Sequence, residues 1–375
     1  MSSDLKKYKL DEFAKLVKKQ YQPNADEELI YIGLEHIEQQ TLRINGYGNS
    51  KNVISQKYRF SSGDILFGKL RPYFRKVVRP KFDGVCSTDI WVIKAKKDFD
   101  QGFLFYFLAN QSFIDACNSG SSGTRMPRAD WNHLSETEWN LPPLPAQRRI
   151  AEILSALDDK IELNRQTNAT LEAIAQAIFK EWFVNFNFPG ATGEMVESEL
   201  GMIPKGWKIG KLEDLVKISS GKGLQKNDFT ETGYPVLGAN GSIGYTDKYL
   251  FEEEVILTGR VGTLGTFQLV NEQVWISDNV LIMQPINKYN YYYSYFAVKA
   301  IDFRNLNRGS TQPLVTKTDL LNQQLLIPEP SSLFKFDIVS RSLFNHLQNN
   351  QQQSANLTTI RDSLLPKLMN GEIEI

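Results

Sequence analysis

The chain contains the same unit twice, and this internal repeat limits its possible folds more than any other feature. Five segments of the first half recur in the second half in the same order. They are Gly63–Leu70 with Glu254–Val261, Ser87–Ile93 with Ile276–Ile282, Tyr106–Phe107 with Tyr295–Phe296, Gly123–Pro127 with Gly309–Pro313, and Leu141–Pro145 with Leu326–Pro330. The offset between partners is smallest where Leu326 matches Leu141 and only slightly larger where Ile256 matches Ile65. A nearly constant offset over all these segments indicates a duplicated structural unit.

Each repeat ends in a long helical pattern whose apolar residues follow a heptad rhythm. The seam residues of the first helix are Ile150, Leu154, Leu157, Ile161, Leu171, Ile178 and Trp182. Those of the second helix include Leu343, Leu347, Leu357, Leu364 and Leu368. The middle of each seam is polar, with Asn164 and Asn168 in the first helix and Asn350 and Ser354 in the second. These residues either set the register or leave a solvated gap.

About 38 residues make a helical rod of roughly 55–60 Å, and we expect the two rods to pack on each other. The alternative is that each helix covers only its own domain. The expected segments are a first domain at 1–145, a helix at 146–186, a linker at 187–207, a second domain at 208–330 and a second helix at 331–375. We therefore predict an α+β fold. Two domains of mixed sheet and helices are separated by two long helices, which form an antiparallel coiled coil with internal pseudo-two-fold symmetry.

Within the domains, local patterns predict helices at residues 10–19 and 102–113. Strands are expected at residues 64–67, 91–94, 255–258 and 280–283, where β-branched and aromatic residues gather. The Gly/Pro-rich stretch between the two copies has the composition of a linker.

The charge of the chain is balanced overall but uneven along the sequence. The 43 Lys and Arg residues equal the 43 Asp and Glu residues. Residues 51–81 nevertheless carry nine basic residues against one acid, Asp64, a local charge of +8. The nine are Lys51, Lys57, Arg59, Lys69, Arg71, Arg75, Lys76, Arg79 and Lys81, with Tyr58, Phe60, Tyr73 and Phe74 between them. This pattern predicts contact with nucleic acid, through phosphates and stacking, and the alternative is a solvated basic face.

Two Gly/Ser/Thr-rich loops, at residues 120–125 and 307–312, are the candidate base-reading segments. Arg pairs bidentately with guanine and Gln with adenine, and glycine lets the backbone approach DNA closely. The alternative is an ordinary surface turn, but the equivalence of the loops across the repeat favours function. The candidate DNA-binding residues are Lys69, Arg71, Arg75, Lys76, Thr124, Arg125, Arg128, Lys222, Arg260, Arg308, Ser310, Thr311, Gln312 and Lys317.

No residue pattern points to catalysis. Gly63–Leu70 has the spacing of a phosphate-binding loop, but Leu70 stands where a Ser or Thr would hold magnesium. The three histidines are scattered and no Cys/His cluster has zinc spacing, so no metal site is expected. Asp158 and Asp159 lie on the first long helix, and we expect them to be solvated helix charges. Neither an Asn-Pro-Pro-aromatic motif for adenine methylation nor a Gly-rich S-adenosylmethionine loop is present.

The cysteines and the apolar runs bear on location. Cys86 and Cys117 are too few for a disulfide framework, and we expect two reduced thiols. The first residues do not resemble a signal peptide, and no run of about 18 apolar residues occurs. These features predict a cytoplasmic protein that makes no membrane contact.

The sequence resembles the DNA specificity subunits of type I restriction–modification systems, which carry two target-recognition domains, each followed by a long helix. The resemblance rests on Leu141–Ala151 with its helix running on to Phe183, on Gly201–Trp207, and on Leu364–Ile373. It covers essentially the whole chain. The second copy departs from the family pattern at Ser331–Phe336, which replaces the Gln-Arg segment that opens the first helix.

This resemblance implies a non-catalytic subunit that recognises a bipartite, asymmetric DNA target and directs partner subunits to it. The implied partners are double-stranded DNA, two methyltransferase (modification) subunits and restriction/translocase subunits. No cofactor is expected on this chain, whereas S-adenosylmethionine, ATP and Mg²⁺ are expected on the partner subunits. The alternatives are a DNA methyltransferase or nuclease with unrecognised motifs, and a protein-interaction scaffold without DNA contact.

The repeat also predicts how half of the chain behaves. Residues 1–186 contain one complete unit, so two copies could pair their helix seams and read an interrupted palindrome. The expected weak point of this pairing is the polar middle, where Asn164 and Asn168 would face each other.

Overall fold

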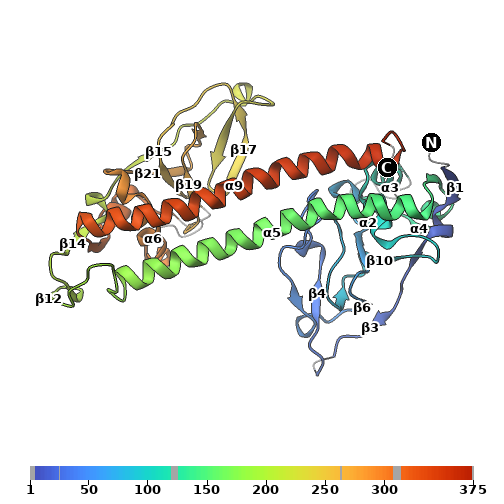
Figure 1. Ribbon diagram of the computed structural model, residues 1–375, viewed down its shortest axis with the longest axis horizontal. Helices are drawn as coiled ribbons and strands as arrows, with labels where there is room; N and C mark the ends of the chain where they lie inside the picture. Colours follow the sequence, from blue (N-terminus) through green and yellow to red (C-terminus); the bar gives the residue numbers. More distant parts are fainter. Residues whose placement is uncertain (1–4, 25, 120–125, 262–263, 307–313, 374–375) are drawn as a thin grey trace. The chain divides into compact units, whose positions relative to one another are not determined.

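The computed structural model describes residues 5–24, 26–119, 126–261, 264–306 and 314–373. The chain divides into two compact units. Unit 1 combines the residues up to Asn164 with those from Gln351 onward, and unit 2 comprises Arg165–Asn350. Helices α5 (Leu144–Phe183) and α9 (Pro330–Met369) each contain 40 residues and contribute to both units (Figure 1).

Unit 1 has mixed α and β structure. Its strands are β1 (Lys6–Lys9), β2 (Ala14–Leu16), β3 (Gln20–Tyr21), β4 (Ile30–Ile32), β5 (Gly48–Asn49), β6 (Lys57–Phe60), β7 (Ile65–Gly68), β8 (Val77–Val78), β9 (Gly84–Cys86), β10 (Ile90–Ala95) and β11 (Glu138–Leu141). Its short helices are α1 (Leu10–Phe13), α2 (Gln101–Ala109), α3 (Gln111–Ser119) and α4 (Trp131–Ser135), with 3₁₀ turns η1 (Leu34–His36), η2 (Ser50–Asn52) and η3 (Pro72–Phe74). The strands form sheets of order β2-β10-β7-β8, β3-β6-β9-β4-β5 and β1-β11.

Unit 2 has the same kinds of elements. Its strands are β12 (Met195–Ser198), β13 (Gly201–Pro204), β14 (Lys208–Lys211), β15 (Val216–Ser220), β16 (Tyr234–Gly238), β17 (Gly241–Thr246), β18 (Val255–Gly259), β19 (Phe267–Val270), β20 (Trp275–Ile276), β21 (Val280–Pro285) and β22 (Gln324–Ile327). Its short helices are α6 (Tyr291–Lys299), α7 (Phe303–Leu306) and α8 (Lys317–Leu321), with 3₁₀ turns η4 (Leu212–Asp214), η5 (Lys226–Asp228) and η6 (Lys288–Asn290). The sheets have the orders β15-β21-β18-β19, β17-β16-β20, β14-β22 and β12-β13.

The shared topology of the two units accounts for the repeat in the sequence. The sheet β15-β21-β18-β19 reproduces β2-β10-β7-β8 strand for strand, and the ladder β14-β22 reproduces β1-β11. The first residues of the helices correspond as well, Pro330 of α9 to Leu144 of α5 and Tyr291 of α6 to Gln101 of α2. The bounds of α2 and α6 therefore align Tyr106 with Phe296, one residue beyond the Tyr295 that the sequence match suggested.

Three expected segments differ from what the structure shows. The helix expected at residues 10–19 ends at Phe13, because Ala14–Leu16 forms an edge strand paired with β10. The helix expected at residues 102–113 is divided into α2 and α3 at Asn110. The linker between the copies contains the hairpin β12–β13, and its Ile203 and Trp207 are buried in the core of unit 2.

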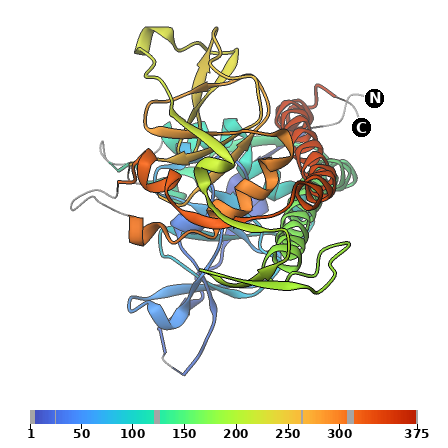
Figure 2. The same cartoon turned by 90° about the vertical axis from the view of Figure 1, so that its left-hand side faces the viewer.

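Each core joins a short apolar helix to the long helices. The residues of α2 from Phe103 to Ala109 are all buried, as expected for a helix that is apolar all round. They share one cluster with Leu154 of α5 and Leu368 of α9. In unit 2, α6 occupies the equivalent place beside the long helices (Figure 2). Its Phe296 packs against Phe179 of α5 and Phe336 of α9.

Helices α5 and α9 run antiparallel in both units. In unit 1, the Asn164 side-chain amide donates to Ser354 Oγ at 3.2 Å and to Gln353 Oε1 at 2.9 Å. In unit 2, the Asn350 side-chain amide donates to Asn168 Oδ1 at 2.9 Å. The polar middle of the seam therefore consists of hydrogen-bonded pairs.

The predicted seam residues differ in burial. Ile150, Leu154, Ile161 and Leu368 are buried. Leu157, Leu171, Ile178, Trp182, Leu343, Leu347, Leu357 and Leu364 are half-buried. Trp182 packs edge-on against Phe336, with ring centroids 5.9 Å apart.

The structure corrects the expectation that Asp158 is a solvated helix charge. Its carboxylate accepts a hydrogen bond from the Tyr106 hydroxyl at 2.6 Å. It also pairs with the guanidinium of Arg361 on α9 at 2.7 Å. Burial and the adjacent Asp158 carboxylate raise the pKa of Tyr106. Asp159 remains exposed and pairs with Lys81 at 3.1 Å.

Two leucines of α5 test this assignment of core and surface. Leu154→Ala should lower the free energy of unfolding by roughly 2–5 kcal/mol, because it leaves a cavity at a fully buried position. Leu163→Ala, at a position 54% exposed, should change it by less than about 0.5 kcal/mol. Denaturant unfolding of the two variants measures both values, and equal losses would contradict the assignment.

Candidate nucleic-acid interface

In unit 1, the segment after the first candidate reading loop is held against the end of β7. The Ala129 amide donates to the Lys69 carbonyl at 2.9 Å, and the Arg71 amide donates to the Pro127 carbonyl at 2.8 Å. Helix α4 follows at once, and the Asp130 side chain caps it by accepting from the Asn132 amide at 2.9 Å. These contacts fix the chain immediately beyond residues 120–125.

Unit 2 makes equivalent contacts at the end of β18. We call each set of contacts between the end of the central strand and the segment after the loop a frame. The Val315 amide donates to the Arg260 carbonyl at 3.2 Å, and Val261 forms a bridge with Leu314. Thr316 caps α8 by accepting from the Asp319 amide at 3.2 Å. Lys69 and Arg260 occupy equivalent positions, because each follows the last residue of the central strand and each anchors the post-loop segment through its carbonyl.

The reading loops themselves lie outside the described residues. This applies to Thr124 and Arg125 in the first loop. It applies equally to Arg308, Ser310, Thr311 and Gln312 in the second loop. The described residues resume at Met126 and at Leu314, next to the contacts given above.

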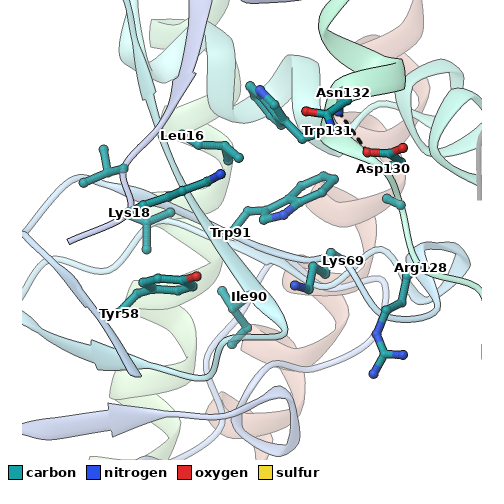
Figure 3. A pocket seen from close by; sticks show the side chains of 13 residues that line it. Leu16, Lys18, Tyr58, Lys69, Ile90, Trp91, Arg128, Asp130, Trp131 and Asn132 are labelled. Carbon is teal, nitrogen blue, oxygen red and sulfur yellow. Dashed lines mark hydrogen bonds between the residues drawn. The ribbon is translucent and has the colours of Figure 1, made fainter. Parts of the chain in front are cut away.

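A groove of about 380 Å³ opens beside the frame of unit 1 (Figure 3). Trp91 lies near its centre, and Trp131 meets Trp91 edge-on with ring centroids 5.4 Å apart. Lys69 lies close to Trp91, and Arg128 lies at the margin (Figure 3). The lining comprises Leu16, Val17, Lys18, Tyr58, Lys69, Ile90, Trp91, Val92, Arg128, Ala129, Asp130, Trp131 and Asn132. Cations and aromatic faces together suit a nucleic acid, whose phosphates and bases they contact.

Part of this groove was not predicted from the sequence. Lys18 and Asn132 were not among the candidates, and Tyr58 was noted only as one of several aromatic residues in the basic segment. The groove residues come from β2 and the residues after it, β6, the residue after β7, β10, and the start of α4 with the segment before it, so no local spacing brings them together. The one available indication was that Trp91 lies in a repeated segment.

Several residues of the basic segment 51–81 have partners within the protein. Lys57 is buried and donates to the Ser55 carbonyl at 2.8 Å, and burial lowers its pKa. Arg59 pairs with Glu27 at 2.7 Å and lies over the ring of Tyr21. The local charge of +8 is therefore partly neutralised by acids from outside the segment.

Two of the candidate DNA-binding residues also hold the fold together. The Arg75 guanidinium donates to the Ala109 carbonyl at 2.7 Å and lies 3.5 Å from Asp362 on α9, and burial lowers its pKa. The Lys76 ammonium donates to the Leu34 carbonyl at 2.5 Å, and burial lowers its pKa. These contacts direct both side chains toward the protein.

The other described candidates are more open. Lys69 and Arg71 are half-buried, and no hydrogen bond or ion pair of their side chains occurs among the described residues. Arg128 is 50% exposed and lies 3.5 Å from Asp89. Lys222, Arg260 and Lys317 are exposed in unit 2. These six residues form the described part of the candidate interface.

Neither a metal cluster nor a membrane span is found in the described part of the chain. No group of three or more His, Cys, Asp or Glu side chains lies close enough to hold a metal ion there. Among the same residues, no helix has the length and apolar character needed to span a bilayer.

Comparison with known proteins identifies the family. Residues 2–173 and 204–333 match the family model described as "Type I restriction modification DNA specificity domain". The chain therefore belongs to this family. The fold and the two equivalent frames agree with a match in each half of the chain.

Similar proteins are named as specificity subunits. The chain is 25% identical to the type I restriction enzyme HindI specificity subunit of Haemophilus influenzae, over 99% of this chain and 100% of that protein. It is 29% identical to the MjaIX specificity subunit of Methanocaldococcus jannaschii, over 73% of this chain and 69% of that protein. The crystal structure of a type I restriction-modification S subunit from M. genitalium aligns with a TM-score of 0.60 and 17% identity, covering 97% of this chain and 96% of that one. This last similarity concerns the fold.

Lys69 tests whether the frame contacts DNA phosphates. In the assembled complex, Lys69→Ala should weaken binding to every duplex alike and reduce the slope of log K against log salt by about one. Lys97→Ala is the matched control, because Lys97 is exposed and lies beyond the opposite end of β10. Fluorescence anisotropy over a salt series measures both slopes. A loss confined to the specific duplex, or an equal effect of Lys97→Ala, would contradict the phosphate role.

Proposed function

We propose that this chain is the DNA-reading subunit of a type I restriction–modification complex, and that its two domains read the two parts of a split, asymmetric target. The observation that carries the proposal is the pair of equivalent frames, one at the end of β7 and one at the end of β18. Each frame fixes the segment that follows one candidate reading loop and carries candidate cations, Lys69 and Arg128 in unit 1 and Arg260 and Lys317 in unit 2. The family described as a DNA specificity domain supports the same role.

The asymmetry of the proposed target follows from differences between the frames. The β-bridge residue after the loop is Arg128 in unit 1 and Leu314 in unit 2. The first residue of the following helix is Trp131 in α4 and Lys317 in α8. The loops differ as well, with Arg125 in the first and Gln312 in the second. Arg and Gln prefer different bases, so the two domains present different chemistry to the DNA.

The chemical steps belong, in this proposal, to partner subunits. Two methyltransferase subunits would carry S-adenosylmethionine, and restriction/translocase subunits would carry ATP and Mg²⁺. This chain supplies recognition and positions the partners on double-stranded DNA in the cytoplasm. The helices α5 and α9 are the expected docking surface for the methyltransferase subunits. A catalytic role is not favoured, because the relatives are named as specificity subunits. A scaffold without DNA contact remains the alternative, which salt-dependent binding separates from this proposal.

Methylome sequencing tests the proposal in cells that express the chain with its methyltransferase partner. The expected modified site has two different specific parts separated by unspecified bases. Arg125→Ala should relax specificity within one part only, since loss of a bidentate contact costs about 1–3 kcal/mol of discrimination. Gln312→Ala should relax the other part, and each variant serves as the control for the other.

Three results would overturn this assignment. The first is methylation that does not depend on this chain. The second is a continuous target without an unspecified spacer. The third is a relaxation of both parts by either single variant. Methyl transfer by the purified chain alone would establish the catalytic alternative.

A further inference from the structure

The two units differ at one contact where the repeat would make them alike. In unit 1, the carboxylate of Asp158 on α5 binds the Tyr106 hydroxyl of α2 and the guanidinium of Arg361 on α9. When the helices are aligned at their first residues, the equivalent positions of unit 2 are Phe296 on α6, Phe344 on α9 and Ala175 on α5. Three polar residues of unit 1, the polar set, therefore occupy the positions that three apolar residues, the apolar set, occupy in unit 2.

The polar set contains a buried charge, the guanidinium of Arg361. Arg361 is 1% exposed, and its Nη1 lies 2.7 Å from Asp158 Oδ1. Its Nε and Nη2 donate to Asp362 Oδ1 at 3.1 and 3.0 Å. The Asp158 side chain is 26% exposed. An ion held this way is tolerated because its partner is in place, and it is strongly unfavourable when the partner is removed.

The apolar set shows that packing does not require a charge at this point. Phe344 stacks on Tyr292 with ring centroids 4.9 Å apart and lies 6.2 Å from Phe296. Ala175 is 1% exposed within the same cluster. The same helix crossing is thus filled by apolar side chains in unit 2. Because apolar residues often replace a buried ion pair without loss of stability, stability alone does not explain the Asp158–Arg361 pair.

The polar residues in the middle of the seam do not determine whether α5 pairs with α9 or with α5 of a second copy. Asn164 faces Ser354, and Asn168 faces Asn350. By the same alignment of α5 with α9, Ser354 and Asn350 are the equivalents of Asn168 and Asn164. If α5 paired with α5 of a second copy in the same register, Asn164 would face Asn168 and the amides could still pair.

We propose that the Asp158–Arg361 pair commits α5 to α9 and excludes pairing between like helices of two copies. In a pairing of α5 with α5, Asp158 would face Ala175 of the second copy. In a pairing of α9 with α9, Arg361 would face Phe344. The first arrangement leaves the Asp158 carboxylate without a counter-ion, and the second leaves the buried Arg361 with only its neighbour Asp362, so only α5 with α9 brings Asp158 and Arg361 together. This proposal opposes the expectation, drawn from the repeat, that two copies of residues 1–186 could pair their helix seams.

The test transplants the apolar set into the full-length chain as Tyr106→Phe, Asp158→Phe and Arg361→Ala together. Thr167→Cys adds a reporter thiol near the centre of a pairing of α5 with α5, and the native Cys86 and Cys117 are buried. The chain is unfolded in urea, refolded at high concentration and treated with a short bismaleimide. The triple variant should give roughly tenfold or more cross-linked dimer than the wild-type background.

Two controls separate partner choice from loss of stability. Lys180→Cys, at an exposed position, is the first control. Its thiol would face residue 152 of the second copy, about 40 Å along the helix from its own counterpart, so it should not cross-link in either background. Arg361→Ala alone leaves Asp158 unpaired and should lower the melting temperature without raising cross-linking at Thr167. Equal cross-linking in wild type and triple variant would overturn the proposal. A triple variant that does not fold by circular dichroism would also overturn it, because the apolar set must be compatible with the seam.

Discussion

The antiparallel pairing of α5 with α9 is the constraint on which the rest of the structure depends. Neither unit has a complete core without a helix contributed from the other half of the sequence. Leu365 and Leu368 of α9 lie in the core of unit 1 beside α2, and Phe183 of α5 lies in the core of unit 2 beside α6. The register of the helix pair therefore fixes which apolar residues reach each domain, and the hydrogen bonds at Asn164 and Asn168 fix that register.

The two frames show how one fold can present two different surfaces. The contacts that hold the post-loop segment to the central strand use main-chain atoms, at the carbonyls of Lys69 and Arg260. Main-chain hydrogen bonds place little demand on side-chain identity, so the side chains at the frame are free to differ. Arg128 in unit 1 and its equivalent Leu314 in unit 2 differ in charge and in hydrogen-bonding capacity, although both occupy the same bridge. Because main-chain atoms hold the frame, the side chains of the candidate recognition surface can vary while the sheet stays constant.

Sequence alone predicted the architecture well because apolar periodicity and repeat offset are local properties that can be counted along the chain. The electrostatics were harder, because the partner of a charge often lies far away in sequence. Arg75 belongs to the basic segment but meets Asp362, and Asp158 meets Arg361 from the opposite half of the chain. The groove around Trp91 was missed for the same reason, since Lys18 and Trp131 reach it from distant segments. The relatives identify the family of the chain, but these contacts decide which cations are available for DNA.

A duplicated chain has an inherent ambiguity, since each contact between α5 and α9 has a counterpart that α5 could make with another α5. Apolar residues do not resolve the ambiguity, because leucine packs against leucine in either pairing. Amides do not resolve it either, because Asn donates and accepts equally well. A buried charge does, because it loses its hydration wherever it is placed and recovers the loss only beside the opposite charge. For such a contact to discriminate, both copies must diverge at both of its ends. The chain meets this condition, because Phe344 occupies the position equivalent to Asp158 and Ala175 occupies the position equivalent to Arg361.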